Sequence, residues 1–150
     1  MDVSAQAEAN RDYALTINDV LDWESDNGTI PSGCLVLLRT GWQAKWINPA
    51  DYLGGSQVDG LHFPGFGLDA VHVLLEGRGV AGLATDTAGV EPGTDTGFSV
   101  SRLALDSRLI VLENLTNLDQ LPPTGALLII GLLRLEGGSG GPVSLTALVP

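Results

Sequence analysis

Short apolar runs alternate along this chain with amphipathic segments and polar turns. The apolar runs predict strands, at residues 34–38, 80–84, 109–112, 126–133 and 143–148. Apolar residues at helical spacing predict short helices, over residues 17–27, 68–78 and 100–106. Because strands and helices take turns, the pattern predicts one α/β domain over residues 1–150, with a mostly parallel or mixed sheet and flanking helices.

The first two predicted helices have clear end signals. Thr16 and Asp19 resemble a capping box with Asp in place of Glu, and Gly28 is a typical stop after the last turn. Gly79 ends the second helix in the same way. The apolar run at 34–38 is continuous, which is typical of a strand covered on both faces. These signals therefore place a buried strand between two helices.

Residues 42–67 show no sustained period, and glycines and prolines interrupt them. Six aromatic or imidazole side chains fall in this segment: Trp42, Trp46, Tyr52, His62, Phe63 and Phe66. A connection of this length without regular structure is unusual unless it is a binding loop or a lid. We therefore expect a long structured loop here.

Length and charge exclude several classes of function. The chain has 150 residues, with seven basic and eighteen acidic side chains and a net charge of −11. This charge repels phosphate backbones and anionic lipid, so no nucleic-acid or membrane partner is expected. No apolar stretch reaches the roughly 18 residues that span a membrane, and residues 1–8 lack the features of a signal peptide. The single Cys34 cannot form an intramolecular disulfide, which fits the cytoplasm.

Four carboxylates come into question for chemistry. Glu113 follows the strand at 109–112, and α/β enzymes keep their functional groups at such strand ends. Asp86 follows the strand at 80–84, where its side chain either enters a pocket or caps a turn. Glu91 and Asp95 belong to a polar, glycine-containing loop, and we expect them to be solvated.

The usual catalytic nucleophiles and metal-ligand clusters are absent from the sequence. His62 and His72 have no partner at ligand-like spacing, so packing or surface exposure is their default interpretation. There is no Gly-x-Ser-x-Gly nucleophile elbow, and Cys34 inside a strand makes a poor nucleophile. Composition and spacing alone therefore indicate an acidic α/β domain with a plausible pocket.

Five motifs occur in a definite order along the chain. They are LLRTGW at residues 37–42, HFPG at 62–65, TDT at 85–87, ENLTNLD at 113–119 and GSGGP at 138–142. This order resembles the putative cyclase family, which includes bacterial kynurenine formamidase and isatin hydrolase-like enzymes. The resemblance covers nearly the whole chain and implies a cyclase-like swivelling β/β/α fold, with a mixed sheet and flanking helices. It also implies hydrolysis of amide or lactam bonds with bound zinc or manganese.

The resemblance identifies two positions of the family's metal site. Glu113 matches a ligand Glu, and Ser101, twelve residues earlier, falls at the position of a ligand His. The main signature, His-x-Gly-Thr-His-x-Asp, lies upstream of the matched region, so the chain resembles an N-terminally truncated member. Because a catalytic metal takes about three protein ligands, we expect no tight metal binding and no formamide hydrolysis by this chain alone.

Three functional hypotheses follow from the resemblance. The chain is an inactive member that keeps the fold, or half of a hydrolase whose other metal ligands belong to a separate chain, or a small-molecule binding protein that uses the remnant pocket. The residues expected to line this pocket are Trp42, Trp46, His62, Phe66 and Asp86. Truncation would expose apolar surface and strand edges, so a homo-oligomer is expected.

Overall fold

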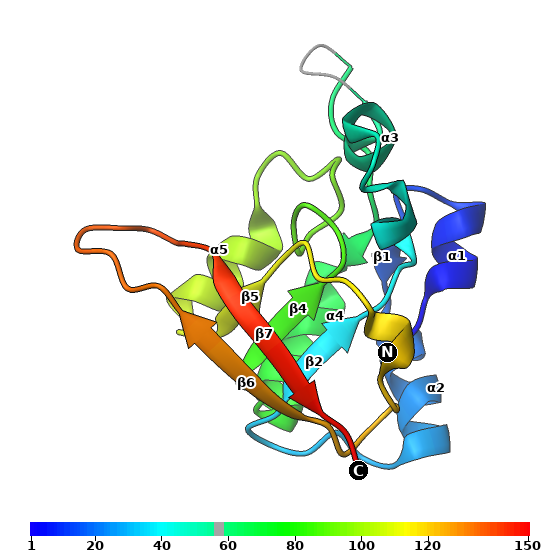
Figure 1. Ribbon diagram of the computed structural model, residues 1–150. Helices are drawn as coiled ribbons and strands as arrows, with labels where there is room; N and C mark the ends of the chain where they lie inside the picture. Colours follow the sequence, from blue (N-terminus) through cyan, green and yellow to red (C-terminus); the bar gives the residue numbers. More distant parts are fainter. Residues whose placement is uncertain (56–58) are drawn as a thin grey trace. The chain divides into compact units, whose positions relative to one another are not determined.

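The computed structural model describes residues 1–55 and 59–150, and its contacts group the chain into two units (Figure 1). The first unit is Met1–Leu118 and the second is Asp119–Pro150; each is described by itself. The organisation of residues 1–150 as one domain stays a prediction. Among the described residues, no helix has both the length and the apolar character needed to span a membrane.

A three-stranded parallel sheet forms the centre of the first unit. Its order is β2 (Leu35–Leu38), β4 (Gly82–Thr85) and β5 (Ile110–Leu112). Leu35 pairs with Gly82, and Gly82 pairs in turn with Ile110. All four residues of the central strand β4 are buried, as expected for a parallel strand covered on both faces. The strands predicted at 34–38, 80–84 and 109–112 are confirmed.

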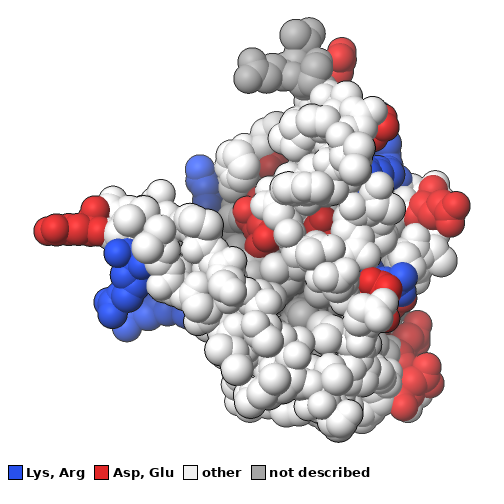
Figure 2. Space-filling view, in the orientation of Figure 1, with Lys and Arg blue, Asp and Glu red and all other residues white. Residues whose placement is uncertain are grey.

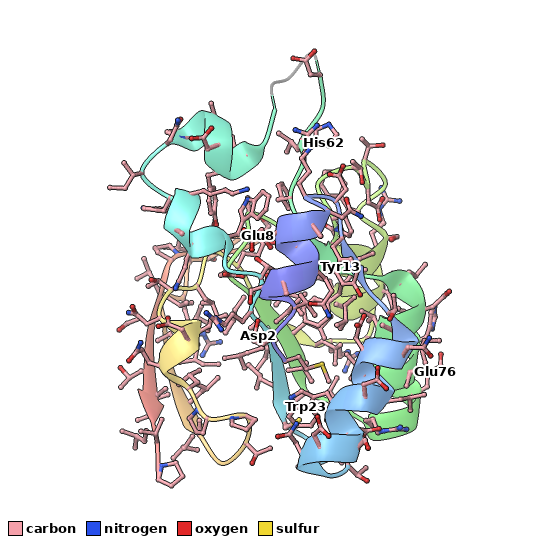
Figure 3. All side chains as sticks on the ribbon, turned by 90° about the vertical axis from the view of Figure 1, so that its right-hand side faces the viewer. Asp2, Glu8, Tyr13, Trp23, His62 and Glu76 are labelled. Carbon is pink, nitrogen blue, oxygen red and sulfur yellow. The ribbon has the colours of Figure 1, made fainter. Side chains whose placement is uncertain are left out.

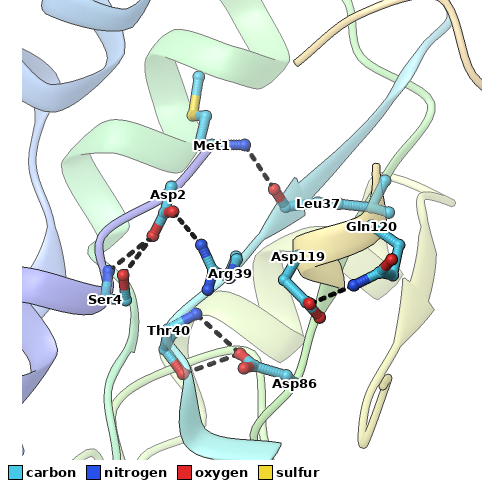
Figure 4. Close-up of polar contacts among 9 residues, drawn as sticks. All are labelled: Met1, Asp2, Ser4, Leu37, Arg39, Thr40, Asp86, Asp119 and Gln120. Atoms are coloured by element: carbon cyan, nitrogen blue, oxygen red, sulfur yellow. Dashed lines mark hydrogen bonds and ion pairs between the residues drawn. The ribbon is translucent and has the colours of Figure 1, made fainter. Parts of the chain in front are cut away.

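The first three residues continue this sheet along the free edge of β2. The backbone nitrogen of Met1 donates to Leu37 O at 2.7 Å, and Val3 N donates to Arg39 O at 2.9 Å. Asp2 and Arg39 form an isolated parallel bridge and an ion pair (Figure 4). The chain then enters α1 (Ser4–Ala9), a helix that the sequence pattern did not indicate.

The predicted helix at 17–27 is confirmed as α2 (Ile17–Asn27), with the expected signals at both ends. Asp19 N donates to Thr16 Oγ1 at 3.2 Å, and Thr16 N donates to Asp19 Oδ2 at 2.7 Å, which completes the capping box. Gly28 ends the helix with φ of 84°, a conformation that favours glycine. Local sequence alone therefore sets the limits of this helix.

The other two predicted helices are present, one of them in altered form. Residues 68–78 form α4 (Leu68–His72) followed by a π-helical turn, η2 (Val73–Gly77), instead of one α-helix. The last predicted helix is α5 (Ser99–Asp106). Val71 of α4 and Leu74 of η2 are fully buried in the main hydrophobic core, together with Leu83 of β4. Burial of these apolar side chains is the dominant force that holds helices on the sheet.

The prediction that residues 42–67 form a long loop without regular structure is wrong for much of the segment that the structure describes. It contains a 3₁₀ turn, η1 (Trp42–Lys45), a helix, α3 (Pro49–Leu53), and a short strand, β3 (Gly65–Phe66). Asn48 and Pro49 are the signal that was missed, because Asn48 Oδ1 accepts from Ala50 N at 3.1 Å and Pro is favoured in the first turn. Strand β3 pairs in parallel with β1 (Ala14–Leu15), which periodicity cannot reveal at two residues. The part of the loop prediction on residues 56–58 lies outside the described residues.

The second unit is built on an antiparallel pair of strands. A 3₁₀ turn, η3 (Leu118–Gln120), precedes β6 (Leu127–Leu132) and β7 (Val143–Leu148). Leu127 pairs with Leu148, and the register runs without a bulge to Leu132 and Val143. Both strands confirm the sequence prediction. The described residues form two parallel sheets and one antiparallel sheet, which gives the mixed α/β character expected.

Candidate functional site

Polar side chains gather where the three parallel strands end. Residues Arg39–Thr40 follow β2, Asp86 follows β4, and Glu113 follows β5. Since the strands are parallel neighbours, their carboxyl ends lie at one edge of the sheet (Figure 1). This is the edge at which open α/β sheets bind ligands.

Asp86 joins the ends of β2 and β4. Its Oδ1 accepts from Thr40 N at 2.9 Å and from Thr40 Oγ1 at 2.8 Å (Figure 4). Its Oδ2 lies 3.4 Å from Gln43 N, which also donates toward it. Asp86 and Thr40 are both buried, so these bonds replace the water that the carboxylate loses. Asp86, which was expected to line the remnant pocket, therefore links the ends of β2 and β4 by hydrogen bonds.

Tyr52 connects α3 to the same edge. Its hydroxyl lies 2.9 Å from the main-chain oxygen of Asp86 and 2.9 Å from Asn114 Oδ1. Burial raises the pKa of Tyr52, and the negative charges of Asp86 and Glu113 raise it further. The hydroxyl is therefore a proton donor at neutral pH. The sequence indicated Tyr52 only as one of the six aromatic or imidazole residues of segment 42–67. Nothing in the sequence indicated that its hydroxyl lies at the ends of the parallel strands.

Glu91 is buried and paired, which corrects the prediction that it is solvated. It is 4% exposed, and it accepts from Ser101 N at 2.8 Å and from Ser101 Oγ at 3.1 Å. Ser101 lies in the first turn of α5, where free backbone N–H groups favour a carboxylate. Val90, which is fully buried, draws the loop inward beside it. The sequence did contain a signal for this contact. Glu91 follows the apolar Val90, and Ser101 lies ten residues later at the start of a helix.

Glu113 lies close enough to Glu91 for the two charges to interact. Glu113 keeps an exposed surface, yet burial of its carboxyl group raises its pKa, and the negative charge of Glu91 raises it further. Ser101, Glu91 and Glu113 therefore form one group, the acidic cluster. The family resemblance identified Glu113 and Ser101, and the structure connects these two residues through Glu91, which the resemblance did not identify.

The described residues do not supply the ligands of a catalytic metal ion. Across residues 1–55 and 59–150, no three His, Cys, Asp or Glu side chains are placed so that they could hold one. The Glu91 carboxylate is committed to Ser101, and that of Asp86 to Thr40. A catalytic zinc takes about three protein ligands, so the donor set present does not fit one.

Trp42 and Trp46 differ sharply in burial. Trp42 is buried, and its Nε1 donates to Tyr52 O at 2.6 Å; Lys45 Nζ lies 3.1 Å from the centre of its ring. Trp46 is 61% exposed and meets the Tyr52 ring edge-on, with 5.0 Å between ring centres. A surface depression of about 300 Å³ adjoins this region. It is lined by Arg11, Trp42, Lys45, Ala50, Asp51 and Gly54.

The remaining residues predicted for the pocket lie in separate surroundings. His62 lies on the segment between α3 and β3 (Figure 3), where Nδ1 is 2.8 Å from Asp12 Oδ1. Phe66 is fully buried in the main hydrophobic core. Of the five predicted pocket residues, only Trp42 lines the depression. The assignment of the five to one substrate pocket stays a prediction.

Comparison with known proteins places this chain in a family. The model of the family described as "Putative cyclase" matches residues 1–92, more than half of the chain. The chain belongs to the putative cyclase family. This confirms the resemblance carried by the five motifs.

Curated and solved relatives in the family are longer than this chain. An isatin hydrolase of Roseibium aggregatum is 35% identical over 154 residues, which cover all of this chain and 58% of the relative. Isatin hydrolase A from Ralstonia solanacearum superposes with a TM-score of 0.94 at 36% identity, covering all of this chain and 58% of that one. Isatin hydrolase A from Labrenzia aggregata, bound to benzyl benzoate, gives a TM-score of 0.92 at 37% identity over 99% of this chain and 58% of its own. The chain thus spans somewhat more than half of these relatives.

Proposed function

We propose that residues 1–150 supply the carboxylate side of an amide-hydrolase site and do not catalyse hydrolysis alone. The substrate class proposed is a cyclic aromatic amide such as isatin, because relatives at 35–37% identity are isatin hydrolases. An N-formyl aromatic amine such as N-formylkynurenine is the second substrate to test. We propose the cytoplasm as compartment, since the chain has a single, unpaired cysteine.

One observation carries this proposal. The acidic cluster lies beyond the ends of the parallel strands, but no group of three potential metal ligands exists among the described residues. Glu113 is the carboxylate that we assign to the completed site, because it follows β5, whereas the carboxylate of Glu91 is already held by Ser101. The other ligands would come from protein outside residues 1–150, in the same polypeptide or in a separate chain.

The experiment compares the isolated chain with a complemented one. Purified residues 1–150 are incubated with zinc or manganese, and bound metal and turnover of isatin and N-formylkynurenine are measured. The assay is repeated with the part of the Ralstonia solanacearum isatin hydrolase that this chain does not cover. We expect neither metal nor turnover for the isolated chain, and both for the mixture. Glu113→Gln should abolish the turnover of the mixture, while Asp22→Asn on the surface of α2 should leave it unchanged.

Two results would overturn the proposal. Stoichiometric metal with turnover by the isolated chain would show that residues 1–150 hold a complete site. A mixture that associates, binds metal and hydrolyses neither substrate would show that the substrate class is wrong.

Binding of a small aromatic anion is a second candidate function. The depression of about 300 Å³ brings together Arg11, Lys45 and the ring of Trp42. Burial is the main reason that the pKa of Lys45 is lowered; the negative charge of Asp51, which also lines the depression, opposes this effect, and the positive charge of Arg11 adds to it. An anion would relieve the repulsion between Lys45 and Arg11, and an aromatic ring on it would add apolar contact area. Millimolar benzoate should then raise the melting temperature, and Lys45→Gln should remove the shift.

A further inference from the structure

Acidic side chains gather in the middle of the face that Figure 2 shows. What such a surface can bind depends on the direction in which each carboxylate points. Glu91 is held by hydrogen bonds from Ser101, and Asp86 by hydrogen bonds from Thr40. Glu113, the carboxylate assigned to the completed site, is held through its neighbours in the chain.

The backbone is fixed on both sides of Glu113. Before it, β5 pairs with the central strand β4 up to Leu112. After it, Asn114 N donates to Thr87 O, beyond the end of β4, at 2.9 Å. Glu113 therefore stands at the tip of a turn whose two ends are both tied to the same strand and its continuation.

The turn after Glu113 contains two residues with left-handed backbone. Asn114 has φ of 59° and Asn117 has φ of 61°. Residues other than glycine rarely adopt this conformation, although asparagine does so more readily than most. Because it costs free energy, it persists where contacts with other parts of the structure hold it.

One segment, residues 42–53, supplies such contacts to both asparagines. The hydroxyl of Tyr52, in α3, lies 2.9 Å from Asn114 Oδ1. Gln43 Oε1, in η1, accepts from Asn117 N at 2.5 Å. The partners are 62 and 74 residues apart in the sequence, so both contacts arise only in the tertiary structure.

Tyr52 is itself firmly placed. It is 5% exposed and packs with Trp42 and Phe63 in a second hydrophobic cluster. Its main-chain oxygen accepts from Trp42 Nε1 at 2.6 Å, and its hydroxyl lies 2.9 Å from the main-chain oxygen of Asp86. Burial raises the pKa of Tyr52, and Glu113 is one of two negative charges that raise it further, which fits a hydroxyl near that carboxylate.

From these contacts we infer that Tyr52 is a positioning residue. Its hydroxyl holds Asn114 in the left-handed conformation and thereby sets the direction of the Glu113 carboxylate. Gln43 supports the same turn at Asn117. The inference rests on the role proposed for Glu113, and it names the side chains that keep this carboxylate in place.

Tyr52→Phe is the decisive variant, because it removes the hydroxyl and keeps the ring. Tyr13→Phe is the matched control, since the Tyr13 hydroxyl donates to Asp19 Oδ2 at 2.7 Å, in the first turn of α2. Crystal structures of both variants should show the Glu113 carboxylate displaced in Tyr52→Phe only. The displacement should exceed about 0.5 Å, the tolerance within which functional groups are held.

Hydrogen exchange separates positioning from a general loss of stability. In Tyr52→Phe, exchange of the Asn114 N–H should accelerate about tenfold more than exchange of the Leu83 N–H in β4. A general loss of stability would accelerate both to the same extent. In Tyr13→Phe, the ratio of the two rates should stay that of the unmodified chain.

A double variant tests whether Tyr52 acts through Asn114. Glycine adopts positive φ without support from a side chain. In an Asn114→Gly background, Tyr52→Phe should therefore displace the Glu113 carboxylate no further. A displacement as large as in the unmodified background would show that the hydroxyl does not act through Asn114.

Turnover by the complemented mixture gives the functional measurement. Tyr52→Phe should lower kcat about 10–100-fold with KM nearly unchanged, the range found for groups that orient a functional side chain. Tyr13→Phe should leave both constants unchanged.

Two further results would overturn the inference. One is a Glu113 carboxylate that keeps its place in Tyr52→Phe, and the other is an active mixture in which this variant keeps its full kcat. A mixture without any turnover would instead count against the proposed function. The inference would then be decided by the crystal structures and the exchange rates of the isolated chain.

Discussion

Ser101 donates two hydrogen bonds to Glu91, from its backbone N–H at 2.8 Å and from its hydroxyl at 3.1 Å. These bonds hold the Glu91 carboxylate against the first turn of α5. From there its negative charge adds to burial in raising the pKa of Glu113 at the end of β5. A helix start, a loop and a strand end are therefore coupled electrostatically, although none of the three residues are neighbours in sequence.

Glu91→Gln should lower the pKa of Glu113. The variant removes the negative charge but not the burial, so the pKa should fall toward its ordinary value of 4.5 without reaching it. A ¹³C NMR titration of the glutamate carboxyl groups measures this directly. Asp69→Asn removes one charge from the exposed start of α4 and serves as the control. An unchanged Glu113 titration in Glu91→Gln would contradict the coupling.

Ser101→Ala should destabilise the fold modestly. The variant loses the hydroxyl bond to Glu91 but keeps the backbone N–H bond, so the expected loss in free energy of unfolding is about 1 kcal/mol. Urea unfolding measures it. Ser139→Ala, in an exposed segment, should have no measurable effect. Equal stabilities for the two variants would mean that the hydroxyl contributes nothing to the acidic cluster.

Asp86→Ala should cost more than Ser101→Ala. It leaves the backbone N–H and the hydroxyl of Thr40 without their acceptor, in a buried position. Each buried donor without a partner costs about 1–3 kcal/mol, so the free energy of unfolding should fall by about 2–4 kcal/mol. The control is Asp22→Ala on the surface of α2. If both aspartate variants unfold at the same urea concentration, Asp86 is not a structural link between β2 and β4.

Sequence pattern alone was sufficient where local signals agree with the fold. The capping box of Thr16 and Asp19 and the glycine at 28 set α2, and continuous apolar runs marked all three strands of the parallel sheet. Strands β1 and β3 were not foreseen because two residues carry no period, and their pairing depends on contacts between distant segments. Such elements exist only in the tertiary structure.

The candidate site was foreseen less well than the fold. Motif order identified Glu113 and Ser101, and the parallel strands put Asp86 at the expected edge. Glu91 was missed because loop composition suggests solvation, whereas its burial results from packing of residues 90–92 against β3. Burial of a loop residue is set by what covers the loop, which composition does not encode.

The ion pair of Glu24 and Arg78 predicts a specific acid sensitivity. Arg78 Nε and Nη2 each donate to the Glu24 carboxylate at 2.7 Å, and these hydrogen bonds are the main reason that the pKa of Glu24 falls from 4.5 to about 2. Because the folded pKa is depressed, the stabilisation is complete above about pH 4.5 and is lost as the pH falls toward 2. Glu24→Gln should therefore lower the melting temperature by about 2–4 °C at pH 6.

The difference between the unmodified chain and Glu24→Gln should shrink as the pH falls below 4.5. Thermal unfolding by circular dichroism at a series of pH values follows it. Asp22→Asn, on the same helix and exposed, should run parallel to the unmodified chain at every pH. A constant difference between pH 6 and pH 3 would show that the charge of Glu24 is not what stabilises the contact.

Gly65→Ala should disturb both the fold and the acidic cluster. A Cβ at Gly65 would lie 2.3 Å from the carbonyl carbon of Glu91, so the loop must move away from β3. Overpacking of this kind costs about 1–3 kcal/mol. Because Glu91 moves with the loop, the pKa of Glu113 should also change. Gly140→Ala, whose Cβ would meet nothing within 4 Å, is the matched control. If Gly65→Ala lowered stability but left the Glu113 titration unchanged, the approach of β3 to the loop would not be what places Glu91 beside Glu113.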